Sequence, residues 1–182
     1  MTASLRRRAL ALAPLALLAS PAQAGDKDWR TLSDVTVGAL IAWSVAVPLV
    51  EGDGEGALQA GVSIAATQGV AQLLKHTVHE TRPDGSDRLS FPSGHTASAF
   101  AAATSIYERR GAGEGVPALA LAGLTGLGRV EARRHHWHDV LAGAAIGGLS
   151  GLVLTHPARE RGMTLVAWGD TGGGGVSLAV GF

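Results

Sequence analysis

The chain has 182 residues, enough for one domain with a hydrophobic core, and it lacks cysteine, which excludes a disulfide framework. Beyond residue 24 it carries 12 basic and 15 acidic side chains, which argues against nucleic acid as a partner, because such proteins present a basic face. Apolar residues make up 46% of the chain and are mostly small, as in closely packed helices within a membrane or within a soluble bundle.

Residues 1–24 have the pattern of a secretory signal peptide. Arg6, Arg7 and Arg8 form a basic start, residues 9–19 are apolar, and Ala22-Gln23-Ala24 matches a cleavage site. The apolar stretch is shorter than the roughly 20 residues of a membrane span. We therefore expect cleavage after Ala24, export, and a mature domain at residues 25–182. An uncleaved anchor helix is the alternative.

Five apolar segments predict five helices, because Ala and Leu dominate them and their length exceeds that of usual strands. They run near residues 35–50, 57–74, 95–107, 116–128 and 139–154. Asp34 is a candidate cap for the first helix, and Pro117 suits the first turn of the fourth. The predicted fold class is all-α, a bundle of about five helices.

The tail at residues 164–182 differs from the rest of the chain. Two short apolar segments, 164–168 and 176–180, flank the Gly-rich stretch 169–175, which predicts a short β-hairpin. Because a lone hairpin is barely stable in water, we expect it to dock on the helices or on a partner.

Helix lengths alone do not separate a membrane bundle from a soluble one. If the basic N-terminus stays inside, each helix reverses the chain, and the helix ends near Lys75, Pro92, Arg129 and His135 fall on the outer side. A soluble bundle would also gather these points at one end. We expect a site at that end, in the periplasm or at the outer face of the inner membrane.

Three short patterns lie at these helix ends. They are Lys75-x6-Arg82-Pro83, Pro92-Ser93-Gly94-His95 and Arg129-x5-His135-x3-Asp139. Together they resemble the three-part signature of the type 2 phosphatidic acid phosphatase (PAP2) and vanadium haloperoxidase superfamily, over about residues 75–139. The family usually has Ser before the third-motif arginine. This chain has Gly128 there, which removes a hydroxyl that can help hold the phosphate.

The cationic residues of these patterns suit a phosphate ester, whose transition state spreads negative charge over three equatorial oxygens. Ser93 suits a helix N-cap, Gly94 lets the backbone come close to a ligand, and a helix start presents free N–H groups to an anion. We expect Lys75, Arg82, Ser93, Gly94 and Arg129 to bind the substrate phosphate.

A nucleophile and a proton donor are also required. His135 and Asp139 are four residues apart, so a helical turn would place them on one face, where the carboxylate fixes the tautomer of the ring. His135 is then the predicted nucleophile, which forms a phosphohistidine, and His95 is the predicted general acid. The resemblance implies the same roles. Since three cationic side chains supply the electrostatics, we expect neither a metal nor another cofactor.

Two further histidines, His136 and His138, lie beside the predicted nucleophile. Neighbouring histidines on a helix point in different directions and chelate poorly, so we expect these two to be exposed or to line the rim of the pocket.

The predicted activity is hydrolysis of phosphate monoesters or pyrophosphates. The resemblance implies lipid substrates, such as phosphatidic acid, phosphatidylglycerophosphate, undecaprenyl pyrophosphate or a lipid A phosphate. Three alternatives stay open: a soluble broad-specificity acid phosphatase, a vanadate-dependent haloperoxidase, and an inactive lipid-binding relative.

Overall fold

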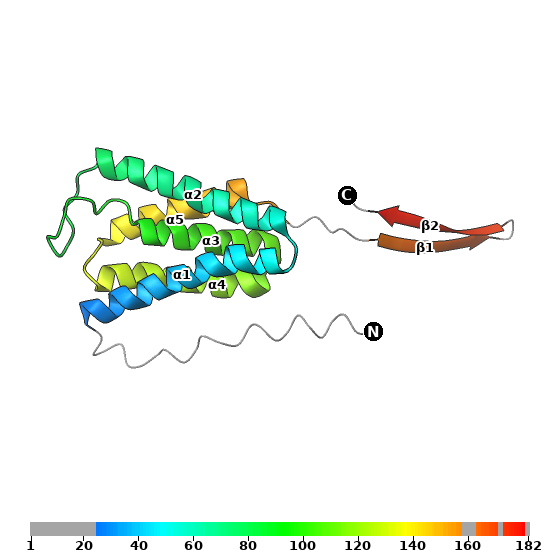
Figure 1. Cartoon of the computed structure of the whole chain (residues 1–182), viewed down its shortest axis with the longest axis horizontal. Coiled ribbons are helices and arrows are strands. Elements are labelled where there is room, and N and C mark those ends of the chain that lie inside the picture. The colour runs from blue at the N-terminus through cyan, green and yellow to red at the C-terminus, as the bar shows by residue number, and fades with distance from the viewer. Residues whose placement is uncertain (1–24, 158–162, 171–172, 181–182) are drawn as a thin grey trace.

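A computed structural model describes residues 25–157, 163–170 and 173–180 (Figure 1). Its elements in chain order are α1 (Asp26–Val50), α2 (Gly54–Thr77), α3 (Gly94–Arg110), α4 (Ala112–Glu131), α5 (Trp137–Leu154), β1 (Met163–Asp170) and β2 (Gly173–Val180). The five helices form the predicted bundle, so the all-α fold class is confirmed. The predicted signal peptide lies outside the described residues.

The first helix begins earlier than the apolar pattern indicates, at Asp26 rather than near residue 35. The N–H of Gly25 donates to Asp28 Oδ2 at 3.0 Å, and two acidic side chains lie in the first turn, where the helix dipole favours negative charge. We expected Asp34 to cap this helix, and this prediction is wrong, because Asp34 lies within α1.

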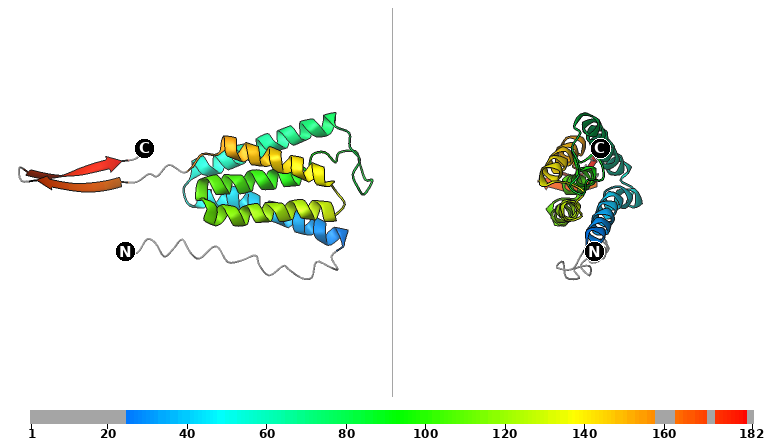
Figure 2. Two further views of the ribbon diagram at one scale, coloured as in Figure 1. Left: turned by 180° about the vertical axis from the view of Figure 1, so that it is seen from behind. Right: turned by 90° about the vertical axis from the view of Figure 1, so that its left-hand side faces the viewer.

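The central helix of the bundle is α3, which packs against the other four helices (Figure 2). Half of its ten buried residues are alanines: Ala97, Ala99, Ala101, Ala102 and Ala103 are fully buried. Small side chains let the neighbouring backbones approach closely, so the core depends on close helix contacts more than on large side chains.

The closest of these contacts joins α5 to α3 through Gly143, Gly147 and Gly151. A Cβ atom at Gly147 would lie 2.0 Å from the carbonyl oxygen of Ala97, and one at Gly143 would lie 2.5 Å from that of Ser93. No side chain fits at either position. The glycines thereby fix the first turn of α5 beside the first turn of α3, where the sequence motifs meet.

Two helices, α1 and α5, are long and apolar enough to cross a membrane, on the grounds of length and composition alone. Only 28% of each apolar window is buried within the bundle, so most of it faces outward. Large apolar side chains are exposed on several helices, among them Leu58, Leu73, Leu141, Leu149 and Leu152.

The tail forms two antiparallel strands, in a register that runs from Met163 opposite Val180 to Asp170 opposite Gly173. Neither strand packs against a helix in the described part of the chain (Figure 1). We expected the hairpin to dock on the helices or on a partner. In the described part of the chain it does not dock on the helices, and docking on a partner stays a prediction.

Candidate active site

The three motifs meet at one end of the bundle, where α2 and α4 end and α3 and α5 begin (Figure 1). Lys75 and Arg129 lie in the last turns of α2 and α4. Arg82 lies in the loop before α3, and His135 lies in the loop before α5. Ser93 caps α3, and His95 and Asp139 lie in the first turns of α3 and α5.

The ring of His135 is buried and held at both nitrogens. Its Nδ1 lies 2.8 Å from the carbonyl oxygen of Ser90, which can only accept, so the proton is assigned to Nδ1. Its Nε2 lies 3.3 Å from Nη1 of Arg82. Burial, together with the charges of Arg82, Arg129 and Lys75, lowers the pKa of His135 to about 4, against the opposing effect of Asp139. The ring is therefore neutral at neutral pH, and the electron pair of Nε2 faces the guanidinium of Arg82.

Asp139 supports this arrangement through Ser90 more than by direct contact. Its Oδ2 accepts from Ser90 Oγ at 2.5 Å and from the backbone N–H of His136 at 2.8 Å, whereas His135 Nδ1 is 3.6 Å away. Burial alone would raise the pKa of Asp139, but the ring of His135 and these two donors hold it well below its usual range. The shared helical face that we expected does not exist, because His135 precedes α5.

Arg82 is fixed beside His135 by its own partners. Its Nε donates to Asp87 Oδ1 at 2.7 Å, and its Nη1 donates to the carbonyl oxygen of Arg134 at 3.0 Å. The side chain is only 11% exposed. Because a guanidinium that is held in this way cannot swing, it presents its charge to one place, next to His135 Nε2.

Lys75 is half-buried and holds the segment that leads into α3. Its Nζ donates to the carbonyl oxygens of Leu89 and Pro92, each at 2.7 Å. Burial and the charge of Arg82 lower the pKa of Lys75 to about 8. Lys75 therefore stays mostly charged at neutral pH but loses its proton in mildly alkaline solution.

Arg129 and His95 share one partner, Asp34 of α1, which lies outside the three motifs. Asp34 Oδ1 lies 3.2 Å from Arg129 Nη1 and 3.0 Å from His95 Nε2. Burial lowers the pKa of Arg129 to about 10. Burial and the charge of Arg129 also lower the pKa of His95, and Asp34 opposes them. The sequence patterns did not assign Asp34 to the site, because nothing in them places α1 beside α3.

Gly128 explains how α1 comes so close. A Cβ atom there would lie 3.1 Å from Ser33 Cβ and 3.1 Å from the carbonyl oxygen of Trp29. The fully buried Ser33 lies across this contact, and its Oγ is 3.3 Å from Arg129 Nη1. Thus the chain lacks a serine before Arg129 but has a hydroxyl from α1 beside the same guanidinium.

Ser93 and Gly94 form the start of α3, as expected. The Ser93 side chain is fully buried, accepts from the backbone N–H of Thr96 and lies 2.9 Å from the Thr96 hydroxyl. Its backbone N–H donates to the carbonyl oxygen of Asp139 at 3.0 Å. The Ser93 hydroxyl is therefore committed to the helix start, and what this segment offers an anion is the helix N-terminus itself.

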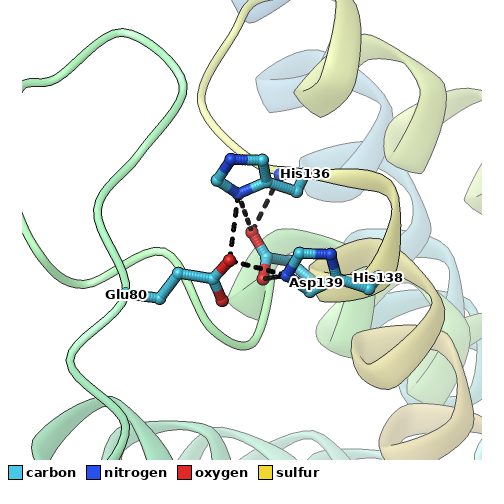
Figure 3. Close-up of side chains that lie close together, drawn as sticks. All are labelled: Glu80, His136, His138 and Asp139. Carbon is cyan, nitrogen blue, oxygen red and sulfur yellow. Dashed lines mark hydrogen bonds and ion pairs between the residues drawn. The ribbon is translucent and has the colours of Figure 1, made fainter.

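The side chains of His136 and His138 are 37% and 59% exposed, but their rings lie close together instead of pointing in different directions. His136 is the N-cap of α5 and is not in its helical part, so the two rings can turn to the same side. Their centroids are 5.1 Å apart. With Glu80 of the α2–α3 loop and Asp139 they form a compact group (Figure 3).

The fold and the site together define a helical bundle with a buried histidine among three cations. Residues 56–162 match the PAP2 superfamily, which is more than half of the chain, and the chain belongs to this family. The resemblance seen in the three motifs is therefore confirmed.

Similar proteins include two lipid A phosphatases. The chain is 40% identical to the lipid A 1-phosphatase of Porphyromonas gingivalis over 93 residues, which cover 50% of the chain and 21% of that protein. It is 32% identical to the lipid A 4'-phosphatase of Helicobacter pylori over 120 residues, 66% of the chain and 54% of that protein. The chain thus matches only about a fifth to a half of the length of these relatives.

Among solved structures, the crystal structure of Aquifex aeolicus LpxE has a TM-score of 0.63 to this bundle. The two chains are 23% identical, and the match covers 75% of this chain and 87% of the other. At this level of identity the match shows a shared fold.

Proposed function

We propose that this protein hydrolyses phosphate esters or pyrophosphates through a phosphohistidine at His135. The observation that carries the proposal is the setting of His135. Its Nδ1–H is fixed by Ser90, and its Nε2 lies 3.3 Å from Arg82 Nη1, a group suited to hold a phosphate oxygen. A buried imidazole with one nitrogen fixed and the other facing a cation is ready to attack phosphorus.

The reaction follows in two steps. In the first, His135 Nε2 forms a bond to phosphorus, the bond from phosphorus to the leaving oxygen breaks, and His95 gives that oxygen its proton. In the second, His95 takes a proton from water, whose oxygen attacks phosphorus and releases inorganic phosphate from His135. Lys75, Arg82, Arg129 and the N-terminus of α3 hold the equatorial oxygens throughout.

This scheme needs no divalent metal for charge stabilisation. Arg82 and Arg129 are 11% and 6% exposed, and Lys75 is half-buried, so all three cations act in a partly desolvated site. Such charges stabilise an anion more strongly than they would in water. They supply what a bound cation supplies in many other phosphatases.

The substrate that we propose is a phosphorylated lipid of the outer face of the inner membrane. Two observations support this. The relatives named above act on lipid A, and the outer faces of α1 and α5 are apolar and mostly unburied. The domain is then exported, lies at the membrane, and has its site toward the periplasm. A soluble acid phosphatase with broad specificity is the second candidate, because α1 and α5 meet only criteria of length and composition.

A phosphate-release assay tests the proposal. The panel contains phosphatidic acid, undecaprenyl pyrophosphate, lipid A and a generic phosphate ester, each with and without EDTA. We expect release from at least one lipid phosphate, retained in EDTA and abolished by His135→Ala. Equal inactivity of the wild type and the variant across the panel would contradict the enzyme assignment. Recovery of the active protein in a detergent-free soluble fraction, with preference for the generic ester, would favour the soluble phosphatase.

A further inference from the structure

Four potential metal ligands converge beside the catalytic histidine (Figure 3). Glu80 approaches from the α2–α3 loop, His136 is the N-cap of α5, and His138 and Asp139 lie in the first turn of α5. Each offers one ligand atom, and these atoms all lie within 4.8 Å of one another. The ligands thus come from two segments that the fold brings together.

Three separations within this group, two of which involve different oxygens of Asp139, are close to the edge length of a tetrahedral site. His136 Nδ1 lies 3.3 Å from Glu80 Oε1 and 3.5 Å from Asp139 Oδ2, and His138 Nε2 lies 3.3 Å from Asp139 Oδ1. A tetrahedron with metal–ligand bonds of about 2.0–2.1 Å has edges of about 3.3–3.4 Å. His138 Nε2 and Glu80 Oε1 are closer, at 2.6 Å, the separation of a direct hydrogen bond, which a bound ion would replace.

Two of the atoms that face this group have no hydrogen-bond partner. They are His136 Nδ1 and Asp139 Oδ1, both buried, and the Asp139 side chain is fully buried. A buried carboxylate oxygen or ring nitrogen without a hydrogen bond is costly, and a bound ion would satisfy both atoms. The group is also accessible from solvent, since the side chains of His136 and His138 are 37% and 59% exposed.

We propose that Glu80, His136, His138 and Asp139 bind one divalent transition-metal ion, with Zn²⁺ the best match. Two imidazole nitrogens and two carboxylate oxygens suit Zn²⁺ in tetrahedral coordination. Mg²⁺ and Ca²⁺ prefer oxygen ligands only and more of them, so the two histidines select against both.

The ion inhibits the enzyme, because the site shares Asp139 with the catalytic group. Asp139 Oδ2 accepts from Ser90, whose carbonyl oxygen holds the ring of His135. A cation bound to Asp139 draws charge from these contacts and so weakens the support of the His135 ring. The inhibition rests on the proposed phosphatase function, whereas the metal site itself does not.

Direct binding is measured on the purified full chain after removal of bound ions with EDTA and exchange into chelator-free buffer. Co²⁺ is the probe, because tetrahedral Co²⁺ absorbs strongly in the visible range, and Zn²⁺ is then added to displace it. We expect one Co²⁺ per chain and loss of the absorption on addition of Zn²⁺. Glu80→Gln and His138→Gln each remove one ligand and are expected to weaken binding by more than about 100-fold, beyond the 10–100-fold effect of groups that merely support ligands.

His156→Gln is the matched control, because His156 is exposed and follows α5 at the opposite end of the bundle. It should bind Co²⁺ like the wild type. Absence of tetrahedral absorption in the wild type, or its full retention in both ligand variants, would overturn the site. Far-ultraviolet circular dichroism of the metal-free proteins confirms that the variants are folded.

The inhibition is measured as phosphate release at increasing Zn²⁺. Glu80→Gln and His138→Gln should keep the metal-free rate and resist Zn²⁺, and His156→Gln should be inhibited like the wild type. Equal inhibition of all four proteins would refute inhibition through this site. An inactive metal-free wild type that still binds Co²⁺ would instead count against the phosphatase function and leave the site standing.

Discussion

Asp34 Oδ1 lies 3.0 Å from Nε2 of His95, and the same oxygen lies 3.2 Å from Arg129 Nη1. One carboxylate of α1 therefore engages both the proposed general acid and a proposed phosphate ligand. Asp34 is 50% exposed, so an incoming phosphate can displace it. It has two opposite effects, because it favours the protonated form of His95 and repels the substrate.

Asp34→Asn should separate these two effects. Loss of the negative charge should lower KM by roughly 1.4- to fivefold, the range for ion pairs worth about 0.2–1 kcal/mol. It should also lower the pKa of His95 further, since Asp34 opposes burial, Arg129 and Arg82 there. A general acid must be protonated, so kcat should decline at a lower pH than in the wild type.

The measurement is a pH profile of kcat and KM for a generic phosphate ester. Glu131→Gln is the control, because it removes an exposed carboxylate at the same end of the bundle. If Asp34→Asn and Glu131→Gln leave both profiles unchanged, Asp34 has no role in the site.

The lowered pKa of Lys75 leads us to expect a fall in kcat/KM in alkaline solution. Burial and Arg82 lower its pKa to about 8, against the opposing charges of Asp139 and Asp87. A lysine is charged below its pKa, so the free enzyme loses this cation as the pH rises through about 8. We expect kcat/KM to fall there, toward tenfold per pH unit, because kcat/KM reports the ionisations of the free enzyme. Lys75→Arg keeps the charge and should move the fall to higher pH, whereas coincident profiles of the two proteins would exclude Lys75 as its source.

Alanine substitutions at the glycines of α5 that contact α3 are expected to lower the stability of the bundle. Gly147→Ala would place a methyl group 2.0 Å from the carbonyl oxygen of Ala97, and we expect a loss of about 1–3 kcal/mol in the free energy of unfolding. Gly143→Ala should have a similar cost and should also reduce phosphate release, because it pushes against Ser93 at the start of α3.

Gly148→Ala is the matched control for these two variants. Beyond its own stretch of helix, no atom lies within 4 Å of the Cβ position at Gly148. Because alanine favours helix, this variant should be as stable as the wild type or slightly more stable. Chemical denaturation of the three variants provides the measurement, and equal stability of all three would contradict the close contact of α3 and α5.

Substitution of Arg109 is expected to lower the stability of the protein but not its kcat/KM. Arg109 lies at the end of α3 opposite the site and donates through Nη2 to both oxygens of Asp53, at 2.7 and 2.6 Å. We expect Arg109→Met to cost about 2–3 kcal/mol, less than a fully buried pair, because Asp53 is 33% exposed. The folded variant should retain wild-type kcat/KM, and a large drop in kcat/KM at a temperature where it is folded would contradict the independence of the two ends.

The order of the helices and the meeting point of the motifs could be predicted from the sequence, because Ala-rich apolar runs mark the helices and charged motifs mark their ends. The start of α1 could not, since residues 26–34 are mostly polar and become helical through the acidic first turn and packing against α4. For this reason the sequence pattern indicated Asp34 as a helix cap.

The relation between His135 and Asp139 was also beyond the sequence. Their spacing of four suggested a shared helical face, but α5 begins after His135. Ser90 connects the two residues, through its carbonyl oxygen to His135 and through its hydroxyl to Asp139. The same helix start turns His136 toward His138. Spacing rules hold inside a helix, and these residues lie at its boundary, which only the folded chain defines.

We propose that His135 carries the phosphate during turnover. This claim is tested most directly by mass spectrometry of the enzyme quenched in alkali during turnover, since phosphohistidine is stable to base and labile to acid. With an ester whose leaving group departs without a proton, such as a nitrophenyl phosphate, His95→Ala should accumulate the intermediate, because it lacks the base that activates water. We expect phosphate on the peptide that contains His135, and none in His135→Asn. Phosphate on another residue, or turnover by His135→Asn at the wild-type rate, would contradict it.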